Sequence, residues 1–212
     1  MYVPKHFEEL DVSVLHALIE SHKLGAWVTQ GDNELVVNHI PFLIDSHAGE
    51  FGKLIGHVAR ANSVWQSFSK SVSSVVIFQG PQAYITPSWY PSKHAHGKAV
   101  PTWNYVVVHA HGIPRAIEDR DRLLEHVNQL TRTQELAQAL PWNVSDAPSD
   151  YIEKMLSLII GIEIPIAKIV GKWKVSQNRP NPDKLGTVAG LMARDDDDSR
   201  AIADLINKHS LL

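Results

Sequence analysis

This 212-residue sequence contains no cysteine. Without thiols the chain cannot form disulfide bonds, hold a metal through thiolates or attack a substrate with a cysteine nucleophile. Three common kinds of small site are therefore excluded.

Long apolar runs are also missing. No window approaches the roughly 18 consecutive apolar residues that a membrane-spanning helix requires. The N-terminal stretch 1–7 has neither the basic nor the apolar region of a signal peptide. We therefore expect a soluble, unexported protein that acts in the cytoplasm and away from membranes.

Positive charge is neither in excess nor clustered. The formal net charge is −3 and the pI is about 6.4, and no group of lysines and arginines resembles the basic stripe of a self-sufficient nucleic-acid binder. A helix-turn-helix signal is absent as well. These features count against direct DNA binding by this chain alone.

Glycine-rich phosphate loops are absent, since the sequence has no G-x-G-x-x-G and no G-x-x-x-x-G-K-[ST]. The G-x-S-x-G elbow of serine hydrolases is also missing. A phosphate, if bound, must be held by side chains. Arg60 is the natural candidate, because it follows a predicted strand and precedes a predicted helix start. An ordinary ion pair with a carboxylate is the alternative.

The chain nevertheless has 44% apolar residues, enough for a sizeable core in one domain. Helical spacing predicts helices over 11–22, near 62–68, over 119–140 and 149–158, and two more after residue 181. Alternating and apolar runs predict strands over 24–29, 35–44, 53–58, 74–78, 82–86, 100–110, 113–117 and 161–176, with a turn at 30–33. Consecutive strands without crossover helices predict an α+β fold built on an antiparallel barrel.

The predicted strand over 100–108 carries the most informative residues. In an extended chain Trp103 and Tyr105 share one face, while Thr102 and Asn104 share the other. One face can stack on a planar ligand and the other can form hydrogen bonds with it. An ordinary core strand with aromatic cross-strand pairs is the alternative.

Two histidine pairs, His94/His96 and His109/His111, have the i, i+2 spacing that puts two imidazoles on one face of a strand. Neither pair has an obvious third ligand, and the first lies in a predicted loop, so we predict no metal site. A single histidine as an axial haem ligand stays open.

Two polar runs near the C-terminus allow more than one interpretation. Residues 171–179 end a strand with an aromatic and several polar groups, which suit an anionic or planar ligand or form a plain cationic rim. The acidic run 195–198 is expected to favour the N-terminus of the last helix, not to bind a metal.

Six segments in order resemble one known family. They are MYVPKHF (1–7), HIPF (39–42), GHVARAN (56–62), YITPSWY (84–90), VPTWNY (100–105) and KWKVSQNR (172–179). The chain closely resembles the PaiB family of FMN-binding negative transcriptional regulators. Six ordered matches over nearly the whole chain are far more specific than any single motif.

The resemblance implies an antiparallel split β-barrel of the FMN-binding type, related to the pyridoxamine-phosphate oxidases, over residues 1–180, with a C-terminal helical extension over 181–212 packed on the same domain. It implies a homodimer that binds FMN where two protomers meet, with the phosphate near Arg60 and Asn62 and the ring along 102–105. The implied cofactor-binding residues are His39, Arg60, Asn62, Pro101, Thr102, Trp103, Asn104, Tyr105, Gln177 and Arg179.

The main functional hypothesis is an FMN-binding dimer that represses transcription, on DNA directly or through a partner. The alternatives are a flavin-dependent oxidoreductase on a small planar substrate and a haem-binding protein on the same barrel. No dedicated general base is evident, so no catalytic residue is predicted, and flavin binding does not by itself entail turnover.

Overall fold

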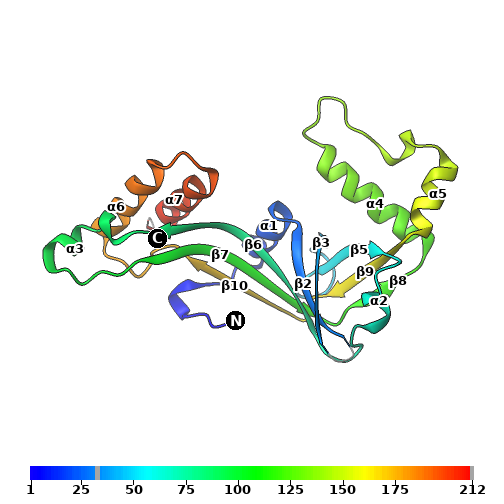
Figure 1. Cartoon of the computed structure of the whole chain (residues 1–212), viewed down its shortest axis with the longest axis horizontal. Coiled ribbons are helices and arrows are strands. Elements are labelled where there is room, and N and C mark those ends of the chain that lie inside the picture. Colours follow the sequence, from blue (N-terminus) through cyan, green and yellow to red (C-terminus); the bar gives the residue numbers. More distant parts are fainter. Residues whose placement is uncertain (32–33, 211–212) are drawn as a thin grey trace. The chain divides into compact units, whose positions relative to one another are not determined.

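The computed structural model describes residues 1–31 and 34–210, so Asp32 and Asn33 of the predicted turn lie outside the described residues. The chain forms two compact units. Unit 1 comprises Met1–Leu18, Gln79–Val108 and Val170–Leu212, and unit 2 comprises Ile19–Phe78 and His109–Ile169. Figure 1 labels the helices and strands of both units.

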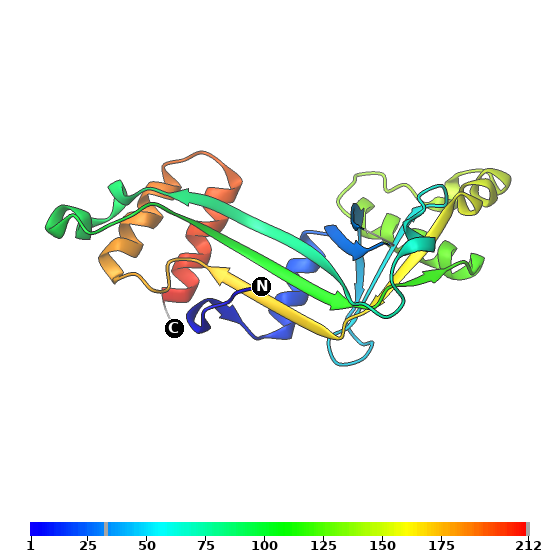
Figure 2. The ribbon, with the colours of Figure 1, turned by 60° about the horizontal axis from the view of Figure 1, so that its bottom comes forward.

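Unit 1 is built on neighbouring strands in the order β1, β10, β7 and β6, and Figure 2 shows the green β7 between β6 and β10. The strands are β1 (Glu8–Glu9), β6 (Ser74–Ile85), β7 (Thr102–Gly112) and β10 (Lys168–Lys174), of which the last three also contribute residues to unit 2. The helices are η1 (Lys5–Phe7), η2 (Pro87–Trp89), α3 (Pro91–His96), α6 (Asn181–Met192) and α7 (Asp197–Ser210). Helices α6 and α7 lie side by side (Figure 1).

Unit 2 contains β2 (Leu24–Gln30) paired with β3 (Leu35–Pro41) and with β6, and a sheet in the order β4, β5, β9, β8. The bounds of that sheet's strands are Leu43–Asp45 for β4, Lys53–Ala59 for β5, Arg115–Ile117 for β8 and Ile159–Pro165 for β9. Its helices are α2 (Val64–Ser67), α4 (Arg120–Glu135), η3 (Val144–Asp146) and α5 (Ser149–Ser157). Helix α1 (Val12–Ser21) has residues in both units.

The core of unit 2 follows from strand alternation. Ile160, Ile162 and Ile164 of β9 are fully buried, and β9 runs antiparallel to β5 along its whole length. Phe42 and Trp27 are also fully buried. This face packs against Phe42, since Ile162 lies opposite Gly56 and a Cβ at Gly56 would lie 3.0 Å from the Phe42 ring, whereas Leu123 of α4 lies against Gly161 on the other face.

Polar N-caps begin several of the predicted helices. The Asp11 carboxylate accepts a hydrogen bond from Ser13 N at 2.9 Å, and the Asp119 carboxylate accepts one from Arg122 N at 2.9 Å. The predicted role of the acidic run 195–198 is confirmed, since Asp196 Oδ1 accepts a hydrogen bond from Ser199 N at 2.7 Å. These caps satisfy amides that a first helical turn leaves free.

The predicted break at Gly80–Pro81 is wrong, because β6 runs without interruption from Ser74 to Ile85. Gly80 is a point of close approach: a Cβ there would lie 2.5 Å from Val106 Cγ2 and 2.7 Å from Leu18 Cδ1. The glycine therefore admits neighbouring side chains and does not form a turn.

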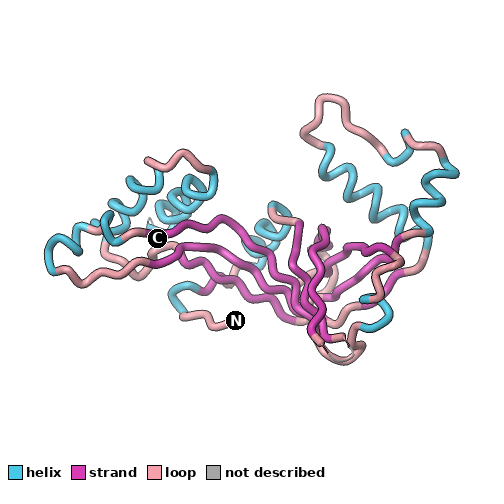
Figure 3. The backbone as a smooth tube through the Cα atoms, in the orientation of Figure 1, coloured by secondary structure: helices cyan, strands magenta, loops and turns pink. Residues whose placement is uncertain are grey.

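Four other boundaries differ from the predictions. The predicted strand 161–176 divides into β9 and β10 just after Pro165, and the predicted strand 35–44 divides into β3 and β4 after Pro41, because proline cannot donate to a ladder. Helix α4 ends at Glu135, and 91–96 is a helix, not a loop (Figure 3). The α+β class with antiparallel sheets is confirmed.

Within residues 1–31 and 34–210, no helix combines the length and apolar character needed to cross a membrane.

Candidate functional site

Two lysines of unit 1 lie beside an aromatic ring. Lys172 and Lys174 are two residues apart on β10 and therefore share one face of the strand. Their ammonium groups lie 5.3 and 5.9 Å from the centroid of the Tyr105 ring of β7. Lys172 Nζ donates a hydrogen bond to the Tyr2 carbonyl at 3.2 Å, and Lys174 Nζ donates one to Thr102 Oγ1. We call Tyr2, Thr102, Tyr105, Lys172 and Lys174 the lysine cluster.

The positive charge of this cluster is not neutralised. Lys172 is only 9% exposed, yet no carboxylate of the described residues lies within 4 Å of either ammonium group. Glu8 faces Lys172 in the register of β1 and β10, but its carboxylate is beyond ion-pair distance. Buried charges are normally paired, and a contact with an aromatic face offsets only about 0.5–2 kcal/mol. The cluster therefore has the charge of an anion-binding site.

The electrostatics of Lys174 support this interpretation. Burial lowers the pKa of its ammonium group below the usual value of 10.5, and the positive charges of Lys172 and Arg179 lower that pKa further. A bound anion would offset both effects, because it stabilises the charged form of each cation.

Arg179 adds a third cation. Its guanidinium carbon lies 4.8 Å from the centroid of the Tyr90 ring, and no carboxylate of the described residues lies within 4 Å of it. Tyr90 is fully buried, and its hydroxyl has no hydrogen-bond partner in the described part of the chain. Asp183 of α6 is buried and accepts hydrogen bonds from Ser92 of α3, from its N at 3.0 Å and its Oγ at 2.6 Å. Asp183 therefore anchors α3 to α6.

The predicted alternation along β7 is present. Trp103 is 53% exposed and makes an edge contact with Tyr84, whose ring centroid is 6.0 Å away. On the other face, Asn104 is 1% exposed, and its Nδ2 donates a hydrogen bond to Ser176 Oγ at 2.8 Å. Trp103 is thus available to a flat ligand, whereas the Asn104 amide stabilises the left-handed turn at Ser176.

Gln177 closes the exit from β10. Its Oε1 accepts a hydrogen bond from Val175 N at 2.8 Å, and its Nε2 donates one to the Trp173 carbonyl. These bonds hold the turn that leads to Arg179. Pro101, at the entry to β7, is exposed.

The other three predicted site residues, His39, Arg60 and Asn62, belong to unit 2. Arg60 Nε donates to the Ser157 carbonyl at 2.9 Å, and Arg60 Nη1 forms an ion pair with Glu118 at 3.3 Å. The ion pair considered as the alternative for Arg60 is therefore present. Its role in holding a phosphate stays a prediction.

Asn62 and His39 have different surroundings. Asn62 Oδ1 accepts a hydrogen bond from Val64 N at 3.0 Å, and Asn62 Nδ2 donates one to Asn38 Oδ1 at 2.8 Å. Asn62 thus bonds the first residue of α2, whose N-cap position is Ser63. His39 is exposed on β3. Their roles as cofactor ligands also stay predictions.

Lys172 and Lys174 were not among the predicted site residues. The sequence carried one signal for them: two lysines at same-face positions flank Trp173, an aromatic residue, in a predicted strand. A solvent-exposed rim has the same pattern, and only burial distinguishes the two.

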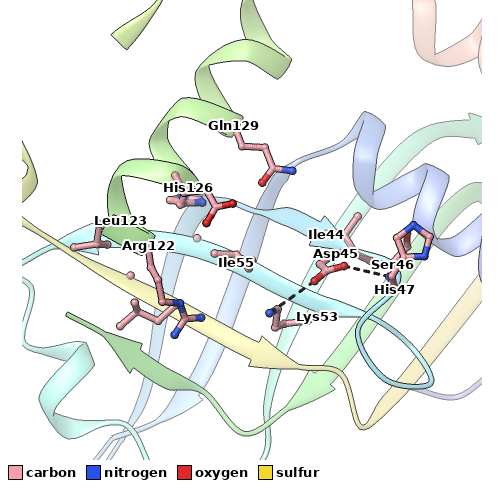
Figure 4. A pocket seen from close by; sticks show the side chains of 14 residues that line it. Ile44, Asp45, Ser46, His47, Lys53, Ile55, Arg122, Leu123, His126 and Gln129 are labelled. Atoms are coloured by element: carbon pink, nitrogen blue, oxygen red, sulfur yellow. Dashed lines mark hydrogen bonds and ion pairs between the residues drawn. The ribbon is translucent and has the colours of Figure 1, made fainter. Parts of the chain in front are cut away.

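Unit 2 also has a polar cavity of about 360 Å³, shown in Figure 4. Its charges neutralise one another: Lys53 lies 3.7 Å from the Asp45 carboxylate and 3.3 Å from that of Glu163, which also pairs with Arg122 at 2.6 Å. Because these cations already have partners, the cavity is a weaker anion site than the lysine cluster.

The histidine pairs do not form metal centres in the described residues, where no group of three histidine, aspartate or glutamate side chains could hold an ion. His109 and His111 do share a face of β7, with ring centroids 6.2 Å apart, and burial lowers the pKa of His109 to about 4. His94 and His96 lie on α3, where residues two apart point in different directions.

Known proteins resemble this chain along most of its length. A family model described as "Putative FMN-binding domain" matches residues 1–168. An uncharacterised protein of Emericella nidulans is 30% identical, covering 98% of this chain and 97% of its own. "Protease synthase and sporulation protein PAI 2" of Bacillus subtilis is 28% identical, covering 97% of this chain and 96% of its own.

Among solved structures, the flavocytochrome Anf3 from Azotobacter vinelandii superposes with a TM-score of 0.59 at 11% sequence identity. The match covers 81% of this chain and 72% of that protein. At such low identity the likeness concerns the fold alone, and it agrees with the predicted antiparallel split β-barrel.

Proposed function

Because this chain belongs to the family described as "Putative FMN-binding domain", we propose that it binds FMN through the lysine cluster. The observation that carries the proposal is the pair of lysines, one of them buried, that lie beside Tyr105 without a carboxylate partner. The relative of Bacillus subtilis confirms the resemblance to PaiB-type proteins.

The residues present fit the chemistry of FMN. Its phosphate is dianionic and its ring system is planar, so a site needs fixed cations, a hydroxyl or amide donor and an aromatic wall. Lys172, Lys174 and the Thr102 hydroxyl supply the first two, and Tyr105 and Trp103 supply aromatic faces. When bound, FMN supplies redox chemistry, while these side chains supply binding and orientation.

K172M and K174M are each expected to weaken FMN binding by about 10- to 100-fold, because a charge-assisted contact with phosphate contributes about 1.5–3 kcal/mol. Titration of FMN fluorescence measures the dissociation constant. K98M changes an exposed lysine of the same unit and is expected to leave the affinity unchanged.

R60A belongs in the same titration, because Arg60 is the phosphate ligand predicted from sequence. A large loss in R60A, together with unchanged affinity in K172M and K174M, would place the phosphate at Arg60 and contradict the lysine cluster.

The regulatory role is the second part of the proposal: an FMN-binding homodimer that represses transcription, on DNA directly or through a partner, in the cytoplasm. It is supported by the similarity to the Bacillus subtilis protein, whose name refers to protease synthesis and sporulation. Retention of a promoter fragment near physiological salt, with sedimentation at the mass of two chains, is the expected result. A monomer that retains no fragment with or without FMN would contradict direct repression.

One observation favours the oxidoreductase as a second candidate. The lowered pKa of Lys174 gives the site a group able to exchange a proton closer to neutral pH than an ordinary lysine. Bleaching of the flavin absorbance by reduced nicotinamide, lost in K174M, would support that function. The haem hypothesis requires a Soret band after haem addition that a single histidine variant abolishes.

A further inference from the structure

Unit 2 contains an apolar cavity of about 430 Å³ that plays no part in the proposed FMN site. Residues from α4, η3 and α5 and from the ends of β5 and β9 line it, and none of the described lining side chains is charged. Apolar members of the lining include Val127, Trp142, Val144, Ile152, Met155 and Ile159.

The size of this cavity is that of a ligand site. Protein interiors rarely leave voids larger than a water molecule, whereas small-molecule pockets span about 300–1,000 Å³. Its mouth is reachable from solvent, since Trp142 and Tyr151 in the lining are each about half exposed. An apolar space of this volume holds water poorly, because a water molecule needs two to four polar partners.

His57 is the lining residue whose hydrogen bonding is most informative. Its Nδ1 lies 3.0 Å from Nε2 of His126, a buried residue of α4. Nδ1 of His126 is buried and has no hydrogen-bond partner among the described residues. His57 Nε2 likewise makes no hydrogen bond within the described part of the chain, and His57 lines the cavity.

The unpaired nitrogen of His126 decides the tautomers. A buried N–H without a partner is rarer in proteins than an unpaired acceptor, so His126 Nδ1 is best assigned as the unprotonated nitrogen. His126 then donates from Nε2 to His57 Nδ1, and His57 carries its own proton on Nε2. Burial lowers the pKa of both imidazoles, which keeps the pair neutral at pH 7.

We propose that this cavity binds a small, flat, uncharged organic molecule whose carbonyl oxygen accepts a hydrogen bond from His57 Nε2. The absence of charged lining selects against an ionic ligand, because a charge moved out of water needs a partner. The rings of Trp142 and Tyr151 provide faces for a planar body. A donor such as His57 Nε2 among mostly apolar walls gives orientation and specificity. The inference is independent of FMN binding, since its residues all belong to unit 2.

The test uses prodan, a neutral naphthyl ketone whose emission moves to shorter wavelength in apolar surroundings. Prodan is expected to bind the full-length protein with such a shift. A matched pair of competitors, 2-acetylnaphthalene and 2-ethylnaphthalene, differ in the carbonyl group. The ketone is expected to displace prodan about five- to tenfold better, the effect of one hydrogen bond.

Variants assign the binding to the cavity. H57F keeps a ring of similar shape and is expected to reduce the preference for the ketone to about one. A147F fills the cavity and is expected to abolish the prodan shift, whereas A95F, on exposed α3, is expected to preserve it. A cooperative thermal unfolding transition shows that each variant is folded. If H57F does not fold, loss of the prodan shift in A147F still tests whether the probe binds in this cavity.

Three results would overturn the proposal. They are no prodan shift in the wild-type protein, an unchanged ketone preference in folded H57F, and a prodan shift that survives A147F. A dimer that dissociates in W142S would also overturn it, because the cavity would then be part of an interface between two copies of the chain.

Discussion

Replacement of Gly112 by alanine is expected to lower the free energy of unfolding by about 3–5 kcal/mol. A Cβ at this position would lie 2.1 Å from the Pro165 carbonyl oxygen and 2.7 Å from Ile164 Cγ2. The closest atom belongs to the backbone, so no side-chain rotation relieves the clash. The strand cannot move freely either, because the Gly112 carbonyl accepts a buried hydrogen bond from Ser74 Oγ at 3.0 Å.

Urea and thermal unfolding measure this effect, and the expected loss corresponds to a melting temperature lower by roughly 6–20 °C for a chain of this size. G97A is the control. Gly97 has a φ of +72°, and a Cβ there would have no neighbouring atom within 4 Å, so alanine adds only backbone strain of about 1–2 kcal/mol. Equal losses in the two variants would show that contact with Pro165 is not the cause.

Acidification from pH 6.5 to pH 4 is expected to remove about 3 kcal/mol of stability through His126 alone. Burial, and then the charge of His57, lower the pKa of His126 to about 4, whereas the ordinary value in an unfolded chain is 6.5. Between these two values the unfolded chain binds a proton that the folded chain does not. Stability is therefore fully present above pH 6.5 and is lost as the pH falls to 4. The lowered pKa of His109, also about 4, acts in the same direction.

The measurement is the free energy of unfolding in urea at a series of pH values from 7.5 to 4. The glutamine in H126Q does not titrate, so this variant is expected to lose most of the contribution of His126 to the dependence of the free energy of unfolding on pH. H126Q is also expected to be less stable than the wild-type protein at pH 7.5. H94Q, which changes an exposed histidine of α3, is expected to keep the wild-type slope. A slope in H126Q equal to that of the wild-type protein would show that another group is responsible.

Several local features were predictable because their causes lie within a few residues. The helices that begin after Asp11 and Asp119 have caps two or three residues from the amides they satisfy. The alternation of Trp103 and Asn104 follows from the geometry of a single strand. The ordered motifs along the chain were sufficient to identify the family, because a match of residues in sequence does not depend on knowing their contacts.

Other features depended on residues far apart in the sequence. Gly80 continues a strand and does not form a turn, because Leu18 and Val106 approach it closely. Arg60 pairs with Glu118, 58 residues away, a choice that the sequence left open among many carboxylates. Such outcomes depend on packing, which a pattern in one segment does not contain.

The sequence by itself determined the absence of thiol chemistry, the α+β class, most helix starts and the family. Only the tertiary structure decided that Lys172 is buried beside Tyr105 without a carboxylate partner, and that His57 and His126 share a hydrogen bond next to an apolar cavity. The physical reason is how far apart along the chain the interacting residues lie. Caps and alternation arise from bonds between near neighbours, whereas burial and unpaired charge depend on every element that packs around a side chain.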